Sequence, residues 1–312
     1  MGPELRHLRY LIAVAEHGSF TRAADELRIS QPTLSQQIKQ LERVVGAQLL
    51  DRSGRGVRPT DAGEVYVRHA RRALGELAAA DRAVLDVADL SRGHLRLAMT
   101  PTFVAYLVGP LARELHTRHP GVTLEVREMT QDRIEAGLLA DELDIGIAFE
   151  GDHLSGIASA PLFTESLGLV VSAHGSEARA GRPVPVRELS RQQLALLSSD
   201  FATRGHIDDY FARHRVSPPI VVEANSVQAL TEIVQRTGPL ATVLPGAITD
   251  DHPHLVPVPV DPPLPTRVVE LLRRESGYES AAARAFTRLA HDLVRERGYA
   301  PAGPRRGRLV GE

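Results

Sequence analysis

The chain has 312 residues, of which 43% are hydrophobic and 24% charged, the composition of an ordinary globular protein. It has no cysteine, which excludes disulfides and thiol catalysis. No apolar run approaches the roughly 20 residues needed to span a bilayer, so we expect no membrane contact and a cytoplasmic location. The net charge of −2 hides an asymmetry, because residues 1–60 hold nine Lys or Arg against six Asp or Glu.

The first 50 residues predict three short helices. Apolar residues recur with helical spacing over residues 5–17, and Gly18 ends that segment. Ser19 is a good N-cap for a second helix over 20–27, and Ser30 for a third that begins at residue 31. Two short helices joined by a tight turn form a helix-turn-helix.

The third helix has an apolar face and a polar face. Leu34, Ile38, Leu41 and Val45 follow helical spacing and are expected to pack against the first two helices. The polar face carries amides and hydroxyls that can read base edges and cations that can hold phosphates. A solvated surface helix would also explain such a face. The candidate DNA-contacting residues are Gln31, Pro32, Thr33, Ser35, Gln36, Lys39 and Arg43.

The next segment favours DNA binding over a plain surface helix. DRSGRGVRPT, residues 51–60, reads as a glycine-rich hairpin that carries Arg52, Arg55 and Arg58. A basic hairpin after a recognition helix is the wing of a winged helix-turn-helix. Its arginines are expected to contact phosphate or to enter the minor groove.

Two stretches resemble the LysR-type transcriptional regulators: LRHLRYLIAVAEHGSFTRAADELRISQPTLSQQIKQLE and GAQLLDRSGRGVRPTDAGE. The match covers about the first 65 residues without a gap. The resemblance implies that Phe20 to Lys39 is the helix-turn-helix. It also implies that Gln31, Pro32, Thr33, Ser35 and Gln36 face bases and nearby phosphates, and that double-stranded promoter DNA is the partner.

Residues 61–90 predict one long amphipathic helix after the winged domain of residues 1–60. Thirty residues at 1.5 Å each give a rod of about 45 Å. The resemblance implies that this linker pairs with the same helix of a second subunit, giving a homodimer or a homotetramer. The alternative is a helix docked on its own chain.

The rest of the chain alternates strands and helices, which indicates an α/β domain with largely parallel sheets over 91–297. Strands are expected at 94–99, 122–128, 144–149, 157–163, 167–172, 194–197, 219–223 and 240–244. Helices are expected at 103–116, 131–140, 203–214, 226–236 and 280–297, and a disordered tail at 298–312. The resemblance implies two subdomains, as in a periplasmic solute-binding protein: subdomain I of 93–163 and 268–297, and subdomain II of 164–267.

Ligands of such sheets bind at the carboxyl ends of strands, against helix N-termini. Threonines follow several predicted strands and begin the next helices, where simple N-capping would also account for each of them. Two such helix starts facing each other would form a small, neutral-to-positive anion site. The candidate effector-binding residues are Thr100, Thr102, Thr130, Gln131, Phe149, Phe201, Ala202 and Thr203.

Stretches such as MTPTF, EMTQDRIE, DELDIGIAF and LLSSDFATRGHIDDYF resemble the cyanate-operon regulators of the family. This resemblance implies a small monovalent anion such as cyanate as effector. The proline-rich sequence after TGPLATVLPGAITDDHPHL departs from that pattern.

No enzyme signature is present: the chain has no G-x-S-x-G elbow, P-loop or H-E-x-x-H motif. His252 and His254 flank a proline and favour a solvated loop over a metal site. Asp141, Glu142 and Asp144 look like paired carboxylates, but we expect Asp141 and Glu142 to be exposed before a strand. No catalytic residue, metal or cofactor is predicted.

The chain is therefore predicted to be a DNA-binding transcriptional regulator that senses a small metabolite and alters promoter binding or bending. Two other classes stay open. One is a ligand-independent oligomeric repressor whose α/β domain only assembles. The other is a solute-binding or catalytic domain with an incidental DNA-binding head.

Overall fold

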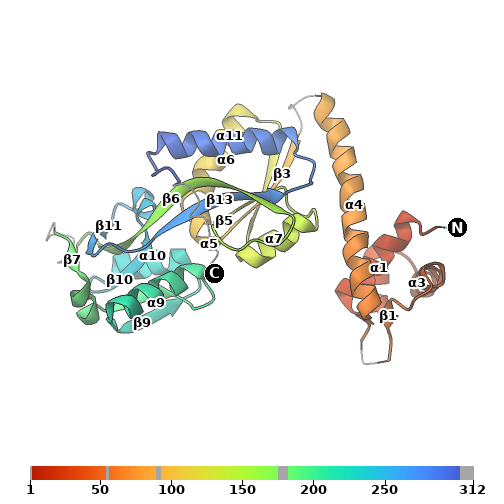
Figure 1. The fold of residues 1–312 in the computed structure, drawn as a ribbon, viewed down its shortest axis with the longest axis horizontal. Coiled ribbons are helices and arrows are strands. Elements are labelled where there is room, and N and C mark those ends of the chain that lie inside the picture. Colours follow the sequence, from red (N-terminus) through yellow and green to blue (C-terminus); the bar gives the residue numbers. More distant parts are fainter. Residues whose placement is uncertain (1, 54–55, 89–92, 175–181, 303–312) are drawn as a thin grey trace, which may run out of the picture.

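The computed structural model describes residues 2–53, 56–88, 93–174 and 182–302. A small helical head and a larger α/β domain lie at opposite ends of the molecule, and one long helix stands between them (Figure 1). Within the described residues, no helix is both long enough and apolar enough to cross a membrane.

Three helices and a short hairpin form the head, and side-chain caps set where two of the helices begin. Ser19 Oγ accepts a hydrogen bond from Arg22 N at the start of α2, and Ser30 Oγ accepts one from Thr33 N at the start of α3. The apolar faces meet in a single core. The elements are α1 (Leu5–His17), α2 (Phe20–Leu27), α3 (Gln31–Val45), β1 (Leu50–Asp51) and β2 (Arg58–Pro59).

The half-buried carboxylate of Glu42 attaches the hairpin to α3. Its Oε1 accepts hydrogen bonds from the backbone N–H groups of Leu49 at 3.0 Å and Leu50 at 3.1 Å. Its Oε2 accepts one from Arg52 at 2.9 Å. β1 and β2 then pair antiparallel, with Leu50 opposite Pro59 and Asp51 opposite Arg58. The direction of the hairpin is therefore set by one side chain of α3.

The linker helix α4 (Asp61–Ala88) begins at Thr60, whose hydroxyl accepts a hydrogen bond from Gly63 N at 3.0 Å. α4 packs against α1 of the head, and Val67 and Ala70 of α4 are buried there. Farther along, Leu77 and Val84 remain exposed in the single chain.

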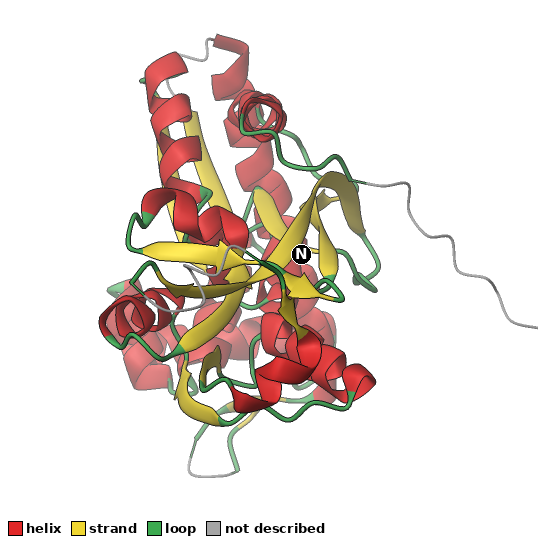
Figure 2. Cartoon of the chain, turned by 90° about the vertical axis from the view of Figure 1, so that its left-hand side faces the viewer, coloured by secondary structure: helices red, strands yellow, loops and turns green. Residues whose placement is uncertain are grey.

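Helices cover both faces of the strands in the C-terminal domain, and the strands twist across its whole width (Figure 2). The strands are β3 (Gly93–Met99), β4 (Val122–Glu128), β5 (Ile145–Phe149), β6 (Ile157–Ser172), β7 (Val184–Pro185), β8 (Leu194–Leu197), β9 (Ile220–Ala224), β10 (Ala241–Pro245), β11 (Leu255–Val258), β12 (Val260–Asp261) and β13 (Thr266–Arg274). The α-helices are α5 (Pro101–Val104), α6 (Val108–Arg118), α7 (Gln131–Leu139), α9 (Ala202–His214), α10 (Val227–Arg236) and α11 (Ala281–Glu296).

Two long antiparallel strands, β6 and β13, run through both halves of this domain. The hydrogen-bonded order is β4-β3-β5-β13-β6-β10-β8-β9, with β11 also paired to β6. β3 is parallel to β4 and β5, and β8 is parallel to β9 and β10. Within each of these two groups the strands are parallel, so their carboxyl ends lie on the same side, where α5 follows β3 and α9 follows β8.

Three secondary-structure predictions are wrong. The helix expected over 103–116 is divided into α5 and α6. Pro110 explains the break, because in a continuous helix it would lack a hydrogen bond and collide with the preceding turn, whereas it is tolerated in the first turn of α6. The strands expected at 157–163 and 167–172 are one strand, β6, whose polar middle is paired to β13. Strands β11 and β13 were not predicted.

The predicted tail begins too early. Ala300 forms an antiparallel bridge with Thr164, and the Tyr299 ring stacks on Phe163 at a centroid distance of 4.9 Å. Residues 298–302 therefore pack on β6, because an aromatic side chain and a free strand edge are available there. Residues 303–312 lie outside the described residues.

Replacing Glu42 by Ala is expected to loosen the hairpin. The variant leaves two backbone N–H groups without their acceptor, which costs about 1–3 kcal/mol. Hydrogen–deuterium exchange of a peptide spanning residues 47–53 should become faster while exchange in α1 stays unchanged. Glu26→Ala, at an exposed site in the same head, is the control. Equal protection in the Glu42 and Glu26 variants would show that Glu42 does not hold the hairpin.

Candidate functional site: a nucleic-acid interface and a buried polar cluster

The polar face of α3 is open to solvent. Gln36 and Lys39 are exposed, whereas the neighbouring Gln37 turns inward and bonds to the ring of His7 at 3.0 Å. The Thr33 hydroxyl lies 2.7 Å from Ser30 Oγ, which fixes the first turn. The predicted DNA-contacting residues Gln31, Pro32, Thr33, Gln36, Lys39 and Arg43 are all exposed, and Ser35 is half-buried. Major-groove recognition requires a helix accessible in this way.

The three arginines of the predicted wing differ in their surroundings. Arg58 is exposed on β2. Arg52 donates to Glu42, and its guanidinium lies 5.1 Å from the centroid of the Phe20 ring. Arg52 is therefore engaged within the head, while Arg58 is open to phosphate. Arg55 lies outside the described residues.

The two subdomains meet at a cluster of buried polar side chains. Thr102 of α5 and Thr203 of α9 are each 1% exposed, and their hydroxyl oxygens lie 3.1 Å apart. Arg267 of β13 donates from Nη1 to Thr203 Oγ1 at 2.8 Å. The predicted meeting of two threonine-bearing helix starts is thus present in the structure, and a buried arginine lies beside them.

The cluster includes a buried ion pair between Arg267 and Glu165. Arg267 Nη2 donates to Glu165 Oε2, and the two residues are register partners on β13 and β6. The Tyr106 hydroxyl donates to Glu165 Oε1 at 2.5 Å. Burial raises the pKa of Glu165, and the charge of Arg267 opposes that shift. Burial, reinforced by the nearby carboxylate of Glu165, also raises the pKa of Tyr106, so the phenol stays protonated and donates.

Two buried polar atoms in this cluster lack a hydrogen-bond partner. They are the Nε of Arg267 and the hydroxyl of Thr100 at the end of β3. The Arg267 guanidinium also lies 3.9 Å from the centroid of the Phe149 ring, in cation–π contact. Unpaired buried polar atoms are rare in proteins, and they mark this cluster as a place where a polar ligand can be recognised.

Four other predicted effector residues lie outside the buried cluster. Thr130 and Ala202 are exposed, and Phe201 is half-buried against the main core. Gln131 is half-buried, and its side-chain oxygen accepts a hydrogen bond from Phe149 N at 3.3 Å. Gln131 therefore positions the strand end that carries Phe149.

Sequence reasoning missed Arg267, Glu165 and Tyr106. The sequence did offer one signal: chain crossovers were expected near 163 and 268, which places adjacent residues between the subdomains. His206, one turn into α9, was not among the predicted effector-binding residues either. Its ring lies 6.5 Å from the Phe149 ring, and partial burial and the charge of Arg267 lower its pKa.

A second polar cluster is centred on His153, in the loop that follows Phe149. His153 is held between two carboxylates, with Nδ1 2.8 Å from Glu135 Oε1 and Nε2 2.7 Å from Glu270 Oε2. The hydrogen bonds and charges of these carboxylates outweigh burial and raise the pKa of His153. Glu135 also accepts from Leu154 N at 2.7 Å. The cluster joins α7, β13 and the loop after β5.

No group of three or more His, Cys, Asp or Glu side chains with metal-binding geometry occurs among the residues that the structure describes.

Comparison with known proteins agrees with this architecture. The family described as "Bacterial regulatory helix-turn-helix protein, lysR family" matches residues 5–64, and "LysR substrate binding domain" matches residues 88–295. The nitrogen assimilation regulatory protein nac of Klebsiella aerogenes is 34% identical over 242 residues, 77% of this chain and 78% of that protein. The DNA-binding transcriptional dual regulator OxyR of Escherichia coli (strain K12) is 30% identical over 287 residues, 89% and 93% of the two chains.

Two solved structures share the fold over almost the whole chain. A full-length OxyR variant from Pseudomonas aeruginosa superimposes with a TM-score of 0.72 at 25% identity, covering 96% of this chain and 99% of that one. Full-length CbnR complexed with its target DNA superimposes with a TM-score of 0.54 at 24% identity, covering 93% and 99%.

The chain belongs to the LysR family: it is a DNA-binding transcriptional regulator with an effector-binding domain. The relatives named above are regulators rather than enzymes, which confirms the prediction that this chain is not an enzyme.

The two histidines of the effector domain should titrate in opposite directions. His153 is expected to have a pKa above the usual value of about 6.5, and His206 a pKa below it. Imidazole carbon chemical shifts of the 13C-histidine-labelled protein, assigned with His153→Gln and His206→Gln, measure both values. A pKa of His153 at or below that of His206 would contradict the two environments described here.

The pH dependence of stability follows from these shifts. Because the folded-state pKa of His153 is raised, its stabilising contribution is complete below about pH 6.5 and disappears as the pH rises through the folded-state value. His206 has the opposite sign, because its folded form resists protonation and loses stability as the pH falls below about 6.5.

Proposed function

We propose that the chain binds an inverted repeat in promoter DNA as a homodimer or homotetramer, with α3 of each head in a major groove. The exposed amides and hydroxyls of α3 support base reading, and Arg58 on the hairpin supports phosphate contact. A DNA complex is known for the structurally similar CbnR. The cytoplasmic location stays a prediction that follows from the DNA target.

The proposed subunit interface is the exposed apolar side of α4. Val65, Leu77 and Val84 are exposed in the single chain, and Val84 is 73% exposed. A two-fold pairing of linker helices would cover these side chains and set the distance between two heads. Two half-sites one or more helical turns apart require such a two-fold arrangement.

We also propose that the effector is a small anion, such as cyanate, bound between the subdomains. The unpaired Nε of Arg267 and the unpaired hydroxyl of Thr100 carry this proposal. An anion would accept hydrogen bonds from both and from the hydroxyls of Thr102 and Thr203, which belong to different subdomains. Glu165 already neutralises one charge of the site, which limits the ligand to one or few negative charges.

The effector would act by population shift. A ligand that bonds to both subdomains favours the relative orientation in which its partners are closest. The rigid linker α4 would convey that orientation to the spacing of the heads. The expected change is therefore in DNA bending or half-site occupancy more than in overall affinity.

One observation favours the alternative, a ligand-independent repressor. Thr102 and Thr203 already bond to each other, so the subdomains are closed in the chain alone. In that case the effector domain would serve only for assembly.

Gln36→Ala and Arg58→Ala should weaken DNA binding in different ways. Loss of Gln36 should relax preference at particular base pairs by about 1–3 kcal/mol. Loss of Arg58, or of Arg55 in the same hairpin, should weaken binding to all sequences and lower the slope of log K against log salt by about one. Titrations of the chain's own upstream DNA at several salt concentrations measure both effects.

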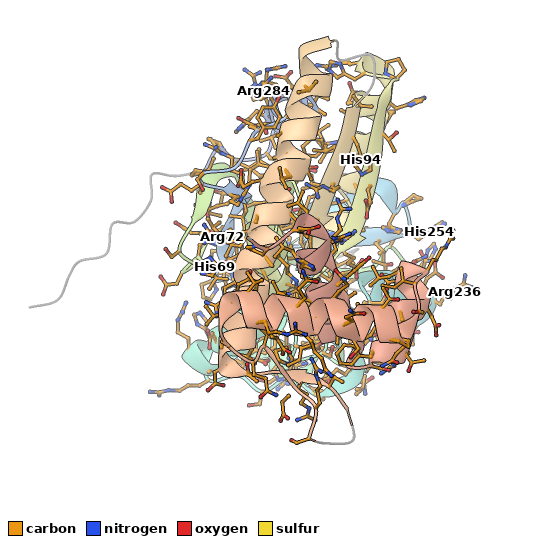
Figure 3. The ribbon with its side chains drawn as sticks, turned by 90° about the vertical axis from the view of Figure 1, so that its right-hand side faces the viewer. His69, Arg72, His94, Arg236, His254 and Arg284 are labelled. Atoms are coloured by element: carbon orange, nitrogen blue, oxygen red, sulfur yellow. The ribbon has the colours of Figure 1, made fainter. Side chains whose placement is uncertain are left out.

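Arg236→Ala is the charge-matched control for these titrations, because Arg236 is exposed (labelled in Figure 3) and lies on α10, which Figure 1 places far from the head. Equal loss of specificity in the Gln36 and Arg58 variants would remove the base-reading role of Gln36. Failure of the unaltered chain to bind promoter fragments at low salt would overturn the DNA proposal.

Cyanate and other small monovalent anions should raise the melting temperature of the unaltered chain, because they bind its folded state. At a concentration of 100 times Kd, such a ligand raises the free energy of unfolding by about 2.7 kcal/mol. Thr203→Val keeps the volume, removes the hydroxyl and should abolish the rise. Thr117→Val removes an exposed helical hydroxyl that bonds only to its own helix, and should keep the rise. If no anion stabilises the unaltered chain, the anion proposal is wrong and assembly without ligand is favoured.

A further inference from the structure

A glycine in the middle of the linker helix allows α4 to touch the effector domain. Gly75 is buried, and an added Cβ there would lie 2.7 Å from the Cβ of Asp141. A glycine inside a helix costs about 1 kcal/mol relative to alanine. The helix therefore gives up stability at a turn where the effector domain approaches it closely.

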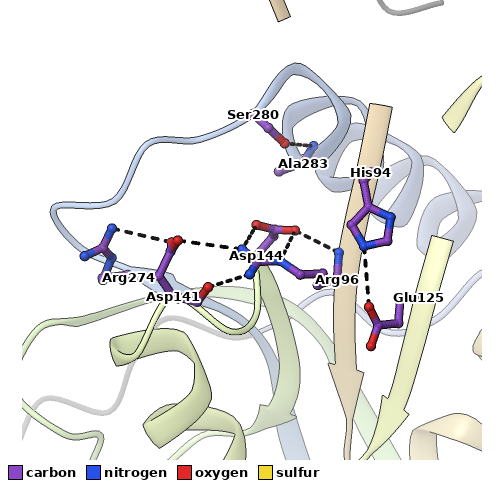
Figure 4. A network of polar contacts seen from close by, with 8 residues as sticks. All are labelled: His94, Arg96, Glu125, Asp141, Asp144, Arg274, Ser280 and Ala283. Atoms are coloured by element: carbon purple, nitrogen blue, oxygen red, sulfur yellow. Dashed lines mark hydrogen bonds and ion pairs between the residues drawn. The ribbon is translucent and has the colours of Figure 1, made fainter. Parts of the chain in front are cut away.

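Asp141 lies in a turn that is held in an unusual conformation. Its φ of 58° falls in the left-handed region, which side-chain-bearing residues rarely adopt. Arg96 of β3 holds the turn, with Nη1 donating to the Asp141 carbonyl at 2.5 Å and Nη2 to Asp144 Oδ1 at 2.7 Å (Figure 4). We expected Asp141 to be exposed, but its side chain is 10% exposed because the turn is enclosed by α4 and two arginines.

Arg274, the last residue of β13, connects the turn to the helix. Its Nη1 lies 2.6 Å from Glu76 Oε1 of α4, and its Nη2 lies 3.6 Å from Asp141 Oδ1 (Figure 4 shows the Asp141 contact). The Arg274 side chain is 8% exposed, whereas the side chain of Glu76 is 57% exposed, so solvent reaches the Glu76 side of this pair. Beside this contact, α4 and α7 are separated by a cavity of about 760 Å³, which Arg274 also lines. The contact between α4 and the effector domain at this point is therefore a small junction.

The junction and the buried polar cluster around Arg267 both include residues of β13. Arg267 and Arg274 are both on β13, seven residues apart, which corresponds to about 23 Å of strand. Between them Glu270 contacts His153. A shift of β13 at the Arg267 cluster therefore moves the guanidinium that holds α4.

We propose that Gly75, Glu76, Asp141 and Arg274 form a docking latch that fixes the linker helix and its DNA-binding head against subdomain I. Docking itself is independent of the ligand and of DNA. Its regulatory role rests on the proposed function: through β13 the latch transmits the state of the Arg267 cluster to the orientation of the heads. The latch is a two-position device, docked or released, rather than a flexible hinge.

Gly75→Ala and Gly75→Leu separate docking from helix stability, because both changes strengthen the helix while blocking the approach of Asp141. Gly205→Ala is the matched control, since Gly205 lies in α9 with open space around it. The chain has no cysteine, so cysteines introduced at Ala73 on α4 and Arg133 on α7, both exposed, can carry spin labels without background. Labelled chains diluted with excess unlabelled chain report the distance within one chain.

The unaltered chain and Gly205→Ala should give one narrow distance distribution. The Gly75 variants, and separately Glu76→Ala, should lose it in favour of a broad, longer one. A narrow distribution retained in Gly75→Leu and Glu76→Ala overturns the latch. Circular dichroism checks that every variant keeps its helix content.

The regulatory part has its own readout in the DNA footprint. Released variants should change the ratio of half-site occupancies by about fivefold or more, the lower end of ordinary allosteric coupling. Release without any change in the footprint overturns transmission while leaving docking intact. If the unaltered chain binds no promoter DNA, the proposed function fails and the regulatory role fails with it, while the distance measurement still decides whether the latch exists.

Discussion

The buried pair of Arg267 and Glu165 places a constraint on the whole effector domain. Two charges taken out of water are tolerated only when each is compensated by its partner and by further hydrogen bonds. Here the compensation comes from Tyr106 in the turn between α5 and α6, from Thr203 of α9 and from the ring face of Phe149 of β5. The pair therefore fixes the positions of that turn, α9 and β5 around the two long strands.

The two long strands β6 and β13 connect the Arg267 cluster physically to the distant junction with α4. β6 and β13 run through both subdomains and pair with each other over most of their length. A strand within a sheet moves as a unit because its backbone hydrogen bonds link it to both neighbours. The Arg267 cluster and the junction with α4 thus lie at the two ends of one strand, β13, with the His153 cluster and a shift of register at Val269 and Glu270 between them.

The head follows a simpler logic. Its core is separate from those of the effector domain, and its contacts with the linker are made mainly between α1 and α4. Glu42 connects α3 to the hairpin inside the head. The shape of the DNA-facing surface therefore depends on contacts within the head rather than on the effector domain.

Much of the head could be predicted from the sequence because its information is local. Ser19 and Ser30 directly precede their helices and each accept a hydrogen bond from a backbone N–H three residues ahead, and the stripe from Leu34 to Val45 specifies which face is buried. The alternation of strands and helices likewise indicated the α/β class. The threonines Thr102 and Thr203 were found because each follows the carboxyl end of a predicted strand, where ligands of such sheets bind.

The arginines that complete the buried polar cluster and the linker junction were decided by tertiary structure. Arg267 meets Glu165 across 102 residues of chain, through strand register that no local pattern specifies. The polar middle of β6 looked like a loop because its burial depends on that distant partner. The roles of Gly75 and Asp141 likewise depend on the packing of two separate elements. The absence of a side chain at Gly75 matters only because Asp141 approaches that position.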